Sequence, residues 1–301
     1  YNRNASIRNS EFAYIGSTAM AAWGHTPSGD QGFNASSGDI PMYTLIDSNL
    51  VREVGIFEKQ SSAWFQAKSM QTIITNNIFF NGPRAGINFN DGMGGGNVIS
   101  RNLVFNFCRE STDHGPFNSW DRQMFLVKSS VYPLYNIISH NLFIANYQST
   151  LAIDNDDGSG FYSTHNNFFV YGSYGQKSDL AGHDIHHASN IYAYINQLCY
   201  FDAGGGEVRN TTHRNRHFNN TCIQSRNLDS YVGIDCKPCD GDACRPIFGN
   251  NTIYNPSGET SVCGVALSEW QKRGYDLGSV VRKGYPSDGF VLDLAKKALY
   301  M

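Results

Sequence analysis

The chain has little charge. Only 16% of its 301 residues are Asp, Glu, Lys or Arg, and the 23 basic and 26 acidic residues form no long run of either sign. Binding to nucleic acid or to an anionic membrane needs concentrated Lys and Arg, so neither partner is expected. The sequence also lacks the roughly 18 consecutive apolar residues of a membrane span and does not open on a basic-then-apolar leader. Neutral or modestly charged partners are therefore expected.

The sequence also lacks the periodicity of helical repeats, because apolar residues do not recur three and four positions apart over a dozen residues. Instead, an Asn followed by apolar, β-prone residues recurs every 23 to 39 positions. Repeats of roughly 20–50 residues indicate solenoids, propellers or arrays. The phrase begins at Asn77, Asn102, Asn141, Asn167, Asn190, Asn220 and Asn251, with weaker members at Asn9 and Asn49.

The content of each repeat predicts strands. Short β-branched and aromatic runs, such as 72–80, 97–107 and 136–146, are separated by Gly, Asn, Asp and Ser. Stacked coils would pair these strands in parallel about 4.8 Å apart. We expect the repeated Asn at a bend, in left-handed backbone, with its amide bonded to the amide of the next coil. The sequence thus predicts an all-β fold, a single-stranded right-handed parallel β-helix.

We expect this solenoid to span residues 1–258, with an inserted loop at 109–132 and a Cys-rich loop at 232–246. Residues 259–301 are expected to form a short, partly helical tail that caps the helix. A solenoid end needs a cap, but residues 5–12 already resemble a strand-Asn-strand phrase. The first coils of a longer precursor are therefore expected to precede Tyr1.

Seven cysteines are present, and four of them cluster late in the chain. No second paired set and no suitably spaced His completes a zinc site, so disulfides are favoured over metal. The candidates are Cys236, Cys239, Cys244 and Cys263. Cys108, Cys199 and Cys222 lie in or beside expected strands and are interpreted as small buried apolar residues.

Asn-x-Ser/Thr sequons occur at Asn4, Asn34, Asn210, Asn219 and Asn250. Together with the Cys-rich loop they favour a secreted, glycosylated protein at the cell surface or outside the cell.

The longest interval in the repeat, from Asn102 to Asn141, contains the densest set of functional side chains. Loops on a rigid scaffold often carry binding and catalysis. The candidates here are Asp113, His114, Asp121 and Arg122. The alternative is a loop held together by its own ion pairs, with Asp113 bonded to Arg109.

Aligning coils on their Asn phrases places residues 87–92 beside 153–158, with 120–122 in the coil between and 177–187 approaching from the same side. Carboxylates, an imidazole and cations would then follow one outer edge at about 4.8 Å per coil. Because a sugar residue spans roughly one such step, this pattern suggests a polysaccharide groove.

Two reactions fit these side chains. Hydrolysis needs two carboxyls, which Asp154, Asp156 and Asp157 could supply, with Asp121 or Asp184 opposite. β-Elimination of a uronic acid needs a base and a cation, for which Lys177, His114 or His183 and Arg122 are candidates.

Asp154, Asp156 and Asp157 could instead hold Ca²⁺, the one cofactor that the sequence suggests. They could also form an ordinary Asp-rich turn. Among the histidines, His114 and His183 each directly adjoin an Asp. His25, His140, His165, His213 and His217 lack such a neighbour and are expected at the surface or in bends.

Segments 59–68, 80–92, 109–122 and 269–279 resemble the pectate-lyase-like right-handed parallel β-helix superfamily. The closer resemblance is to an uncharacterised secreted subgroup that carries His-Gly-Pro-Phe-Asn-Ser-Trp-Asp-Arg, here residues 114–122. The superfamily includes polysaccharide lyases, glycosidases and epimerases, so the resemblance implies this fold and a carbohydrate ligand. The motifs of polygalacturonases and classical pectate lyases are not intact in this sequence.

Two functions remain open. The first is a protein that binds or cleaves polysaccharide, and if it is an enzyme, it is a polysaccharide lyase or a glycoside hydrolase. The second is a non-catalytic glycoprotein module of an extracellular filament, wall or flagellar hair, with further copies or neighbouring chains as partners. The polar residues of 109–122 and 154–184 favour the first, and the uncapped coils favour the second.

Overall fold

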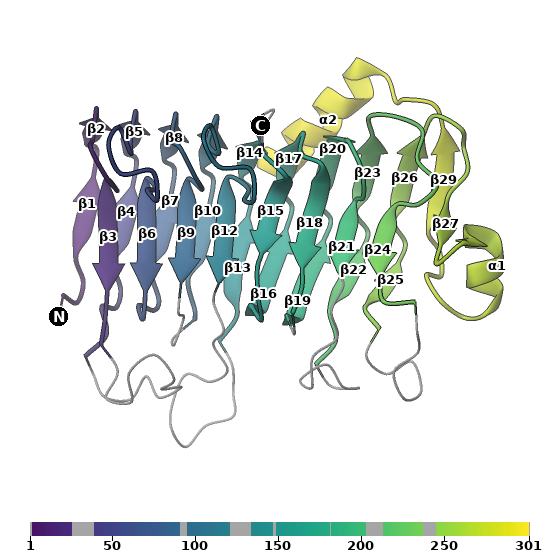
Figure 1. Ribbon diagram of the computed structural model, residues 1–301, viewed down its shortest axis with the longest axis horizontal. Coiled ribbons are helices and arrows are strands. Elements are labelled where there is room, and N and C mark those ends of the chain that lie inside the picture. Colours follow the sequence, from purple (N-terminus) through teal and green to yellow (C-terminus); the bar gives the residue numbers. More distant parts are fainter. Residues whose placement is uncertain are drawn as a thin grey trace.

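The computed structural model describes residues 2–25, 39–90, 95–120, 134–146, 149–180, 182–202, 213–236 and 245–300. The chain winds through three long sheets, and the coils follow one another in chain order along the long axis of the molecule (Figure 1). Every strand pair within these sheets is parallel, for example β4 with β7 and β10 with β13. The predicted all-β parallel solenoid is confirmed.

Sheet I contains nine strands. They are β1 (Ser6–Arg8), β4 (Leu45–Asp47), β7 (Ile73–Thr75), β10 (Val98–Ser100), β13 (Asn136–Ser139), β16 (Gly160–His165), β19 (His183–Ala188), β22 (Arg216–Phe218) and β25 (Ile247–Gly249).

Sheet II contains ten strands. They are β2 (Glu11–Ala13), β5 (Leu50–Arg52), β8 (Ile78–Phe80), β11 (Leu103–Phe105), β14 (Leu142–Ile144), β17 (Phe168–Val170), β20 (Ile191–Ile195), β23 (Thr221–Gln224), β26 (Thr252–Asn255) and β29 (Val280–Lys283).

Sheet III contains eight strands. They are β3 (Met20–Trp23), β6 (Trp64–Ala67), β9 (Ile87–Asn90), β12 (Phe117–Trp120), β15 (Leu151–Asn155), β18 (Tyr174–Ser178), β21 (Tyr200–Asp202) and β24 (Val232–Ile234). A small antiparallel pair, β27 (Ser261–Val262) and β28 (Val265–Ala266), precedes helix α1 (Leu267–Lys272), and helix α2 (Asp288–Leu299) ends the chain.

The core is built from inward side chains that repeat at the same position of each coil. In sheet II the rings of Phe143, Phe169 and Tyr192 stack nearly parallel, with centroids 5.3 and 5.1 Å apart. All three are fully buried. Because neighbouring coils supply equivalent positions, one continuous apolar core runs along the stack.

The repeated Asn residues form a buried ladder between sheets I and II. The backbone N–H of each donates to the side-chain oxygen of the Asn one coil later, as in Asn141 to Asn167 and Asn167 to Asn190, both at 3.0 Å. The predicted amide contact between coils is therefore confirmed. The full series runs Asn49, Asn77, Asn102, Asn141, Asn167, Asn190, Asn220 and Asn251.

The expected left-handed backbone lies one residue earlier. Positive φ angles belong to the residue before each ladder Asn, such as Asn76 (57°) and Asn166 (54°), while the ladder Asn residues themselves have none. Asn9, expected as a weak ladder member, has such a left-handed φ of 50°. Ser10 takes the ladder position instead, and its backbone N–H donates to Asn49.

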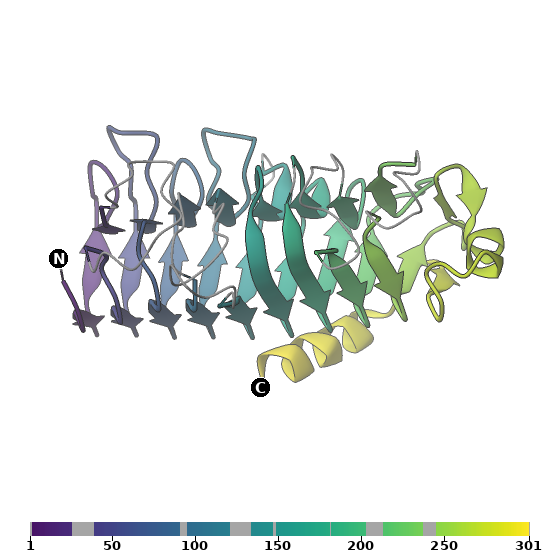
Figure 2. The ribbon, with the colours of Figure 1, turned by 90° about the horizontal axis from the view of Figure 1, so that it is seen from below.

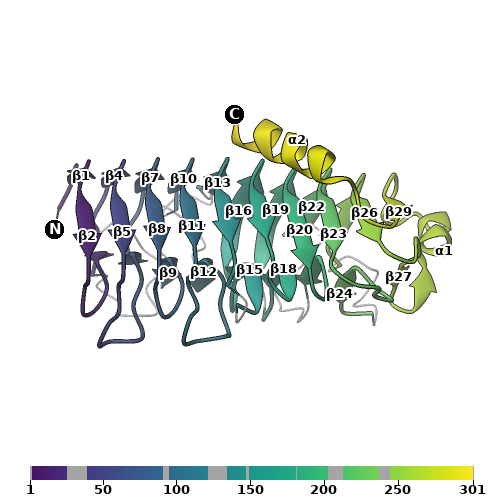
Figure 3. The same cartoon turned by 90° about the horizontal axis from the view of Figure 1, so that it is seen from above.

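Helix α2 lies along the outside of sheet II, over strands near the middle and C-terminal part of the stack (Figures 2 and 3). Ser287 caps its first turn by accepting a hydrogen bond from the backbone of Phe290 at 3.2 Å. Its buried Val291 and Ala298 pack on the outer side chains of sheet II. Because β29 pairs with β26, the C-terminal tail adds a strand to the solenoid beyond the expected boundary at 258.

Two of the expected loops contain regular strands. β12 lies within 109–132 and pairs with β9 and β15, so only part of this segment departs from the coil. β24 lies within 232–246. Residues 121–132 and 237–244 are outside the described residues.

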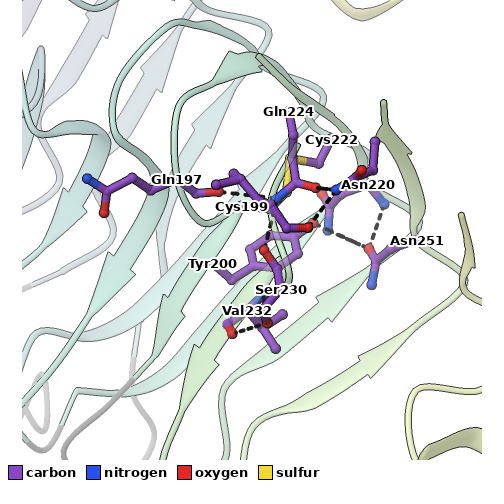
Figure 4. The surroundings of a disulfide bond; sticks show 11 residues. Gln197, Cys199, Tyr200, Asn220, Cys222, Gln224, Ser230, Val232 and Asn251 are labelled. Carbon is purple, nitrogen blue, oxygen red and sulfur yellow. Dashed lines mark hydrogen bonds between the residues drawn. A yellow bond between two sulfur atoms is a disulfide. The ribbon is translucent and has the colours of Figure 1, made fainter. Parts of the chain in front are cut away.

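The described residues form two disulfides, Cys199–Cys222 and Cys236–Cys263. Cys236 and Cys263 confirm the expected kind of bond, whereas Cys239 and Cys244 lie outside the described residues. Cys199 and Cys222 are buried, as expected, but their interpretation as simple apolar residues is wrong, because they lie side by side on neighbouring coils and are bonded (Figure 4). Cys108 is buried and unpaired, as expected. In the described ranges, no helix is long and apolar enough to cross a membrane.

Candidate functional site

A column of polar side chains follows the outer face of sheet III. Strand register aligns Asn88 with Asn118, Asn118 with Asp154, and Asp154 with Lys177. The flanking residues Phe117 and Ile153 belong to the core, so strand alternation turns the polar column outward. This register confirms the alignment of 87–90 with 153–156 predicted from the Asn phrases.

Lys177 is the centre of the cluster. Its ammonium nitrogen Nζ lies 3.5 Å from Asp154 Oδ1 and 3.3 Å from Asp179 Oδ2, and it also donates a close hydrogen bond to Asp156. Burial lowers the pKa of Lys177, but these three carboxylates outweigh it and the net pKa is raised. Lys177 is therefore a fixed cation and a poor proton acceptor at neutral pH. Its side chain is 17% exposed, so one side reaches solvent.

Asp154 is the fully buried member of the cluster. Its Oδ2 lies 3.4 Å from His114 Nδ1, and neither carboxylate oxygen has a hydrogen-bond partner of good geometry in the described residues. Burial raises the pKa of Asp154 to about 6, although contacts with His114 and Lys177 oppose the rise. A carboxyl that titrates near neutrality is suited to exchange a proton.

The turn after β15 positions the other carboxylates. Asp156 begins it and donates its backbone N–H to Ser119 of the preceding coil at 2.7 Å, while Ser159 N–H bonds back to the carbonyl of Asp156 at 3.0 Å. Gly158 supplies the left-handed residue with φ 71°. The segment is thus the turn that the sequence allowed, and the side chain of Asp156 still contacts Lys177.

The carboxylates that could share a metal ion are Asp156, Asp157 and Asp179, with one oxygen of each within 4.8 Å of the others. The expected set contained Asp154 instead of Asp179, but the carboxylate of Asp154 contacts Lys177 and His114. Oxygen donors suit Ca²⁺. Because Lys177 already supplies a positive charge to Asp156 and Asp179, Ca²⁺ would compete with it.

Aromatic side chains lie on the same face at both ends of the polar column. Trp23 is 64% exposed, and its ring centroid lies 5.5 Å from that of Phe65, which aligns with Asn88. Two coils beyond Asp154, Phe201 aligns with Lys177 and contacts Tyr174 at 5.3 Å. Sequence reasoning missed these aromatic residues, although their strand register follows from the same repeat.

A second polar cluster lies at the start of β19 in sheet I, just after the turn that follows β18. Asp184 Oδ2 lies 2.8 Å from His183 Nδ1 and 2.7 Å from His213 Nδ1. The expectation that His213 lacks an acidic neighbour is wrong. His183 and His213 each precede a ladder Asn, Asn190 and Asn220, by the same interval, and this spacing could have revealed the pair.

His217 also differs from expectation. It is fully buried inside the solenoid, with Nε2 3.1 Å from Asp202 Oδ2 and its ring stacked on Phe248 at 4.9 Å. It belongs to the polar interior of the late coils rather than to a surface bend.

Residues 109–114 are held from both sides, because Arg109 and Glu110 contact earlier coils while Thr112 and His114 accept hydrogen bonds from the next coil. Arg109 contacts Glu53 at 3.7 Å and Glu110 contacts Lys59 at 2.9 Å, rather than the expected Arg109–Asp113 pair. Asp113 is exposed and accepts a hydrogen bond from Ser111 at 2.5 Å. Asp121 and Arg122 lie outside the described residues, so His114 is the member of this loop that the structure brings to Asp154.

The sequons fall into two groups. Asn4, Asn219 and Asn250 are exposed, as an acceptor of glycan requires, and Asn34 and Asn210 lie outside the described residues. A pocket of about 620 Å³ lies at the C-terminal coils, where Arg245 is 5.4 Å above the ring of Trp270, and it is not part of the Lys177 cluster.

No family model, no curated protein and no solved structure matches the chain. The site is therefore interpreted from its own residues.

Proposed function

We propose that this is an extracellular protein that binds a neutral polysaccharide along the outer face of sheet III. The carrying observation is a row of accessible side chains on sheet III, which contains the exposed Trp23 and the partly exposed Phe65, Lys177, Tyr174 and Phe201. The buried polar column of Asn88, Asn118 and Asp154 lies on the same strands and holds Lys177 in place. The Lys177 ammonium can bond sugar hydroxyls, while aromatic rings pack on the apolar faces of sugar rings. Successive coils about 4.8 Å apart match the repeat of a glycan chain.

Charge supports a neutral ligand over a uronic acid. Around Lys177, the carboxylates of Asp156, Asp157 and Asp179 outnumber the single ammonium, even when Asp154 and His114 are left aside. An anionic chain would be repelled at this point. Lys177, held as a cation by its neighbours, would also be a poor base for β-elimination.

Hydrolysis is the reaction that fits this site better, with Asp154 as acid and Asp156 as base. Asp154, however, is fully buried and has no exposed surface from which to protonate a glycosidic oxygen. Binding is therefore the primary proposal, and cleavage is an additional measurement on the same samples. The two disulfides are compatible with a secreted protein.

The test is affinity electrophoresis and calorimetry with neutral glucans, xylans and mannans, compared with pectate and alginate. Trp23→Ala should weaken binding to a neutral glycan at least about tenfold, which corresponds to about 1.4 kcal/mol. Phe57→Ala is the matched control, because Phe57 is also an exposed aromatic residue but lies in a turn away from sheet III strands. Binding should be unchanged in this control.

A preference for uronic acid polymers, or equal binding by the Trp23→Ala and wild-type proteins, would refute the proposed ligand and face. Reducing ends are measured in parallel. If they appear, Asp156→Asn should abolish them.

A structural role in an extracellular assembly is the second candidate. It is favoured by an apolar stripe on the outside of sheet II, where Ile78 is exposed and the half-buried rings of Phe80 and Phe105 stack at 4.9 Å. The same face is covered by α2 farther along the stack. Sedimentation analysis tests this role: self-association that Ile78→Asp abolishes would support it, and a monomer at all concentrations would contradict it.

A further inference from the structure

His183, Asp184 and His213 form a compact cluster outside the proposed glycan face. Both imidazole Nδ1 atoms point to the same carboxylate oxygen of Asp184, at 2.8 and 2.7 Å. The two rings come from neighbouring coils, with centroids 5.7 Å apart. One potential ligand atom from each residue lies within 4.8 Å of the others.

The surrounding fold holds these groups in place. Gly160 lies in the preceding coil, where it pairs with His183. A Cβ at Gly160 would lie only 2.9 Å from the imidazole. The absence of a side chain at this position therefore makes room for the ring. Phe161 packs its ring edge-on against His183 at 5.1 Å, and His183 is 2% exposed.

Asp184 has a left-handed backbone with φ 51°, an uncommon conformation for a residue with a side chain. The equivalent residue of the previous coil, Phe161, has the same conformation with φ 59°. The bend is therefore a feature of these coils, and it directs the carboxylate of Asp184 between the two imidazoles.

We propose that His183, Asp184 and His213 bind a divalent transition metal ion, with Zn²⁺ as the best fit. Two nitrogen donors and one carboxylate favour zinc over Ca²⁺ or Mg²⁺, which prefer sites made of oxygen. Ligation through Nδ1 requires each neutral imidazole to carry its proton on Nε2. Tetrahedral ligands at about 2.0–2.1 Å from zinc lie about 3.4 Å apart, so each Nδ1–Oδ2 distance needs to lengthen by roughly half an ångström from its present 2.8 or 2.7 Å.

The site has an open side. The side chain of His213 is 39% exposed, whereas His183 faces Phe161 and the coil below. Three protein ligands would therefore leave a fourth position to water or to a small anionic ligand. This is the arrangement of zinc sites that interact with other molecules rather than of closed structural sites.

Isothermal titration of ZnCl₂ into untagged, chelator-treated protein tests the proposal. The wild type should bind one equivalent. His213→Gln, which changes the exposed ligand and spares the buried one, should weaken binding at least about tenfold, and Asp184→Asn should do the same. His25→Gln is the matched control, because His25 is exposed and lies far along the chain from the cluster.

Circular dichroism of each variant shows whether it folds, so loss of the fold is distinguished from loss of a ligand. Visible absorption of bound Co²⁺ reports nitrogen ligation in a tetrahedral site, and it should disappear in His213→Gln. The proposal is overturned if the folded wild type binds no zinc, or if His213→Gln binds it as tightly. Loss of zinc binding in Asp157→Asn but not in His213→Gln would also overturn it, because the ion would then belong to the acidic group.

Discussion

At the scale of the residue, Lys177 decides the properties of the proposed glycan face. It is the shared cation of Asp154, Asp156 and Asp179, and Asp154 is fully buried beside it. Removing one partner of a buried ion pair leaves an uncompensated charge, which usually destabilises a protein more than the pair ever stabilised it.

We predict that Lys177→Met lowers the free energy of unfolding by about 3 kcal/mol at pH 7.5. The folded pKa of Asp154 is raised by burial to about 6, above its ordinary value of 3.8, so deprotonating it as pH rises opposes folding. Loss of the Lys177 charge raises this pKa further. The deficit should therefore shrink as the pH falls from 7.5 toward 4, where folded Asp154 is protonated in the wild type and in the variant.

Urea unfolding at several pH values measures this effect. Lys59→Met is the control, because its ion pair with Glu110 is half exposed on both sides and should contribute less than about 1 kcal/mol. A deficit for Lys177→Met that does not change with pH would show that Asp154 is not the group responsible.

The sequence predicted the meeting of Asp154, Asp156 and Lys177, because coils aligned on the repeated Asn place them at one level. It did not predict the burial of Asp154, which depends on where His114 lies. Nor did it identify the bond of Cys199 to Cys222, because the two residues occupy different positions of neighbouring coils, Cys199 just before β21 and Cys222 within β23. Strand positions alone did not distinguish a bonded cysteine from an apolar one.

At the scale of the element, the Asn ladder stabilises the bend between sheets I and II. The side chain of Asn167 donates to the carbonyls of Ile138 and His165 at 2.8 and 3.1 Å, and its oxygen accepts from Asn141. The ladder Asn residues were predictable because they recur along the sequence. The backbone geometry of the bend was not predictable, because the residue with left-handed φ precedes the Asn and its type differs from coil to coil.

Asn167→Ala should destabilise the protein by about 3 kcal/mol, because it leaves several buried N–H and C=O groups without partners. Thermal and urea unfolding measure the change. Asn227→Ala, at an exposed position outside the ladder, should change stability by less than about 0.5 kcal/mol. Equal effects of the two substitutions would contradict a stabilising role for the ladder.

At the scale of the whole molecule, each coil contacts its neighbours and little else. The stability of such a stack is the sum of the stability of each coil and of its interfaces with neighbouring coils. A coil with two neighbours should therefore unfold locally less often than a coil with one. Helix α2 adds contacts to β17 and β20 in particular. The solenoid itself was predictable because its pattern repeats, whereas the position of α2 depends on a single segment.

Hydrogen exchange followed by mass spectrometry should therefore show the slowest backbone exchange in β16–β20 and the fastest in β1–β3 of this chain. Val291→Asp, which places a charge against the outer face of sheet II, should accelerate exchange in β17 and β20 and leave β4–β8 unchanged. Uniform exchange along the stack, or acceleration everywhere in the variant, would show that the molecule unfolds as one cooperative unit.

The amides of the Asn ladder give the stack a direction. Each N–H donates toward the C-terminal end, from Ser10 through Asn251, and Ser279 accepts the last bond. The successive bonds thus share one orientation along the described coils. Aligned hydrogen bonds in a buried, low-dielectric setting polarise one another, so each amide of the series should strengthen the bonds before and after it.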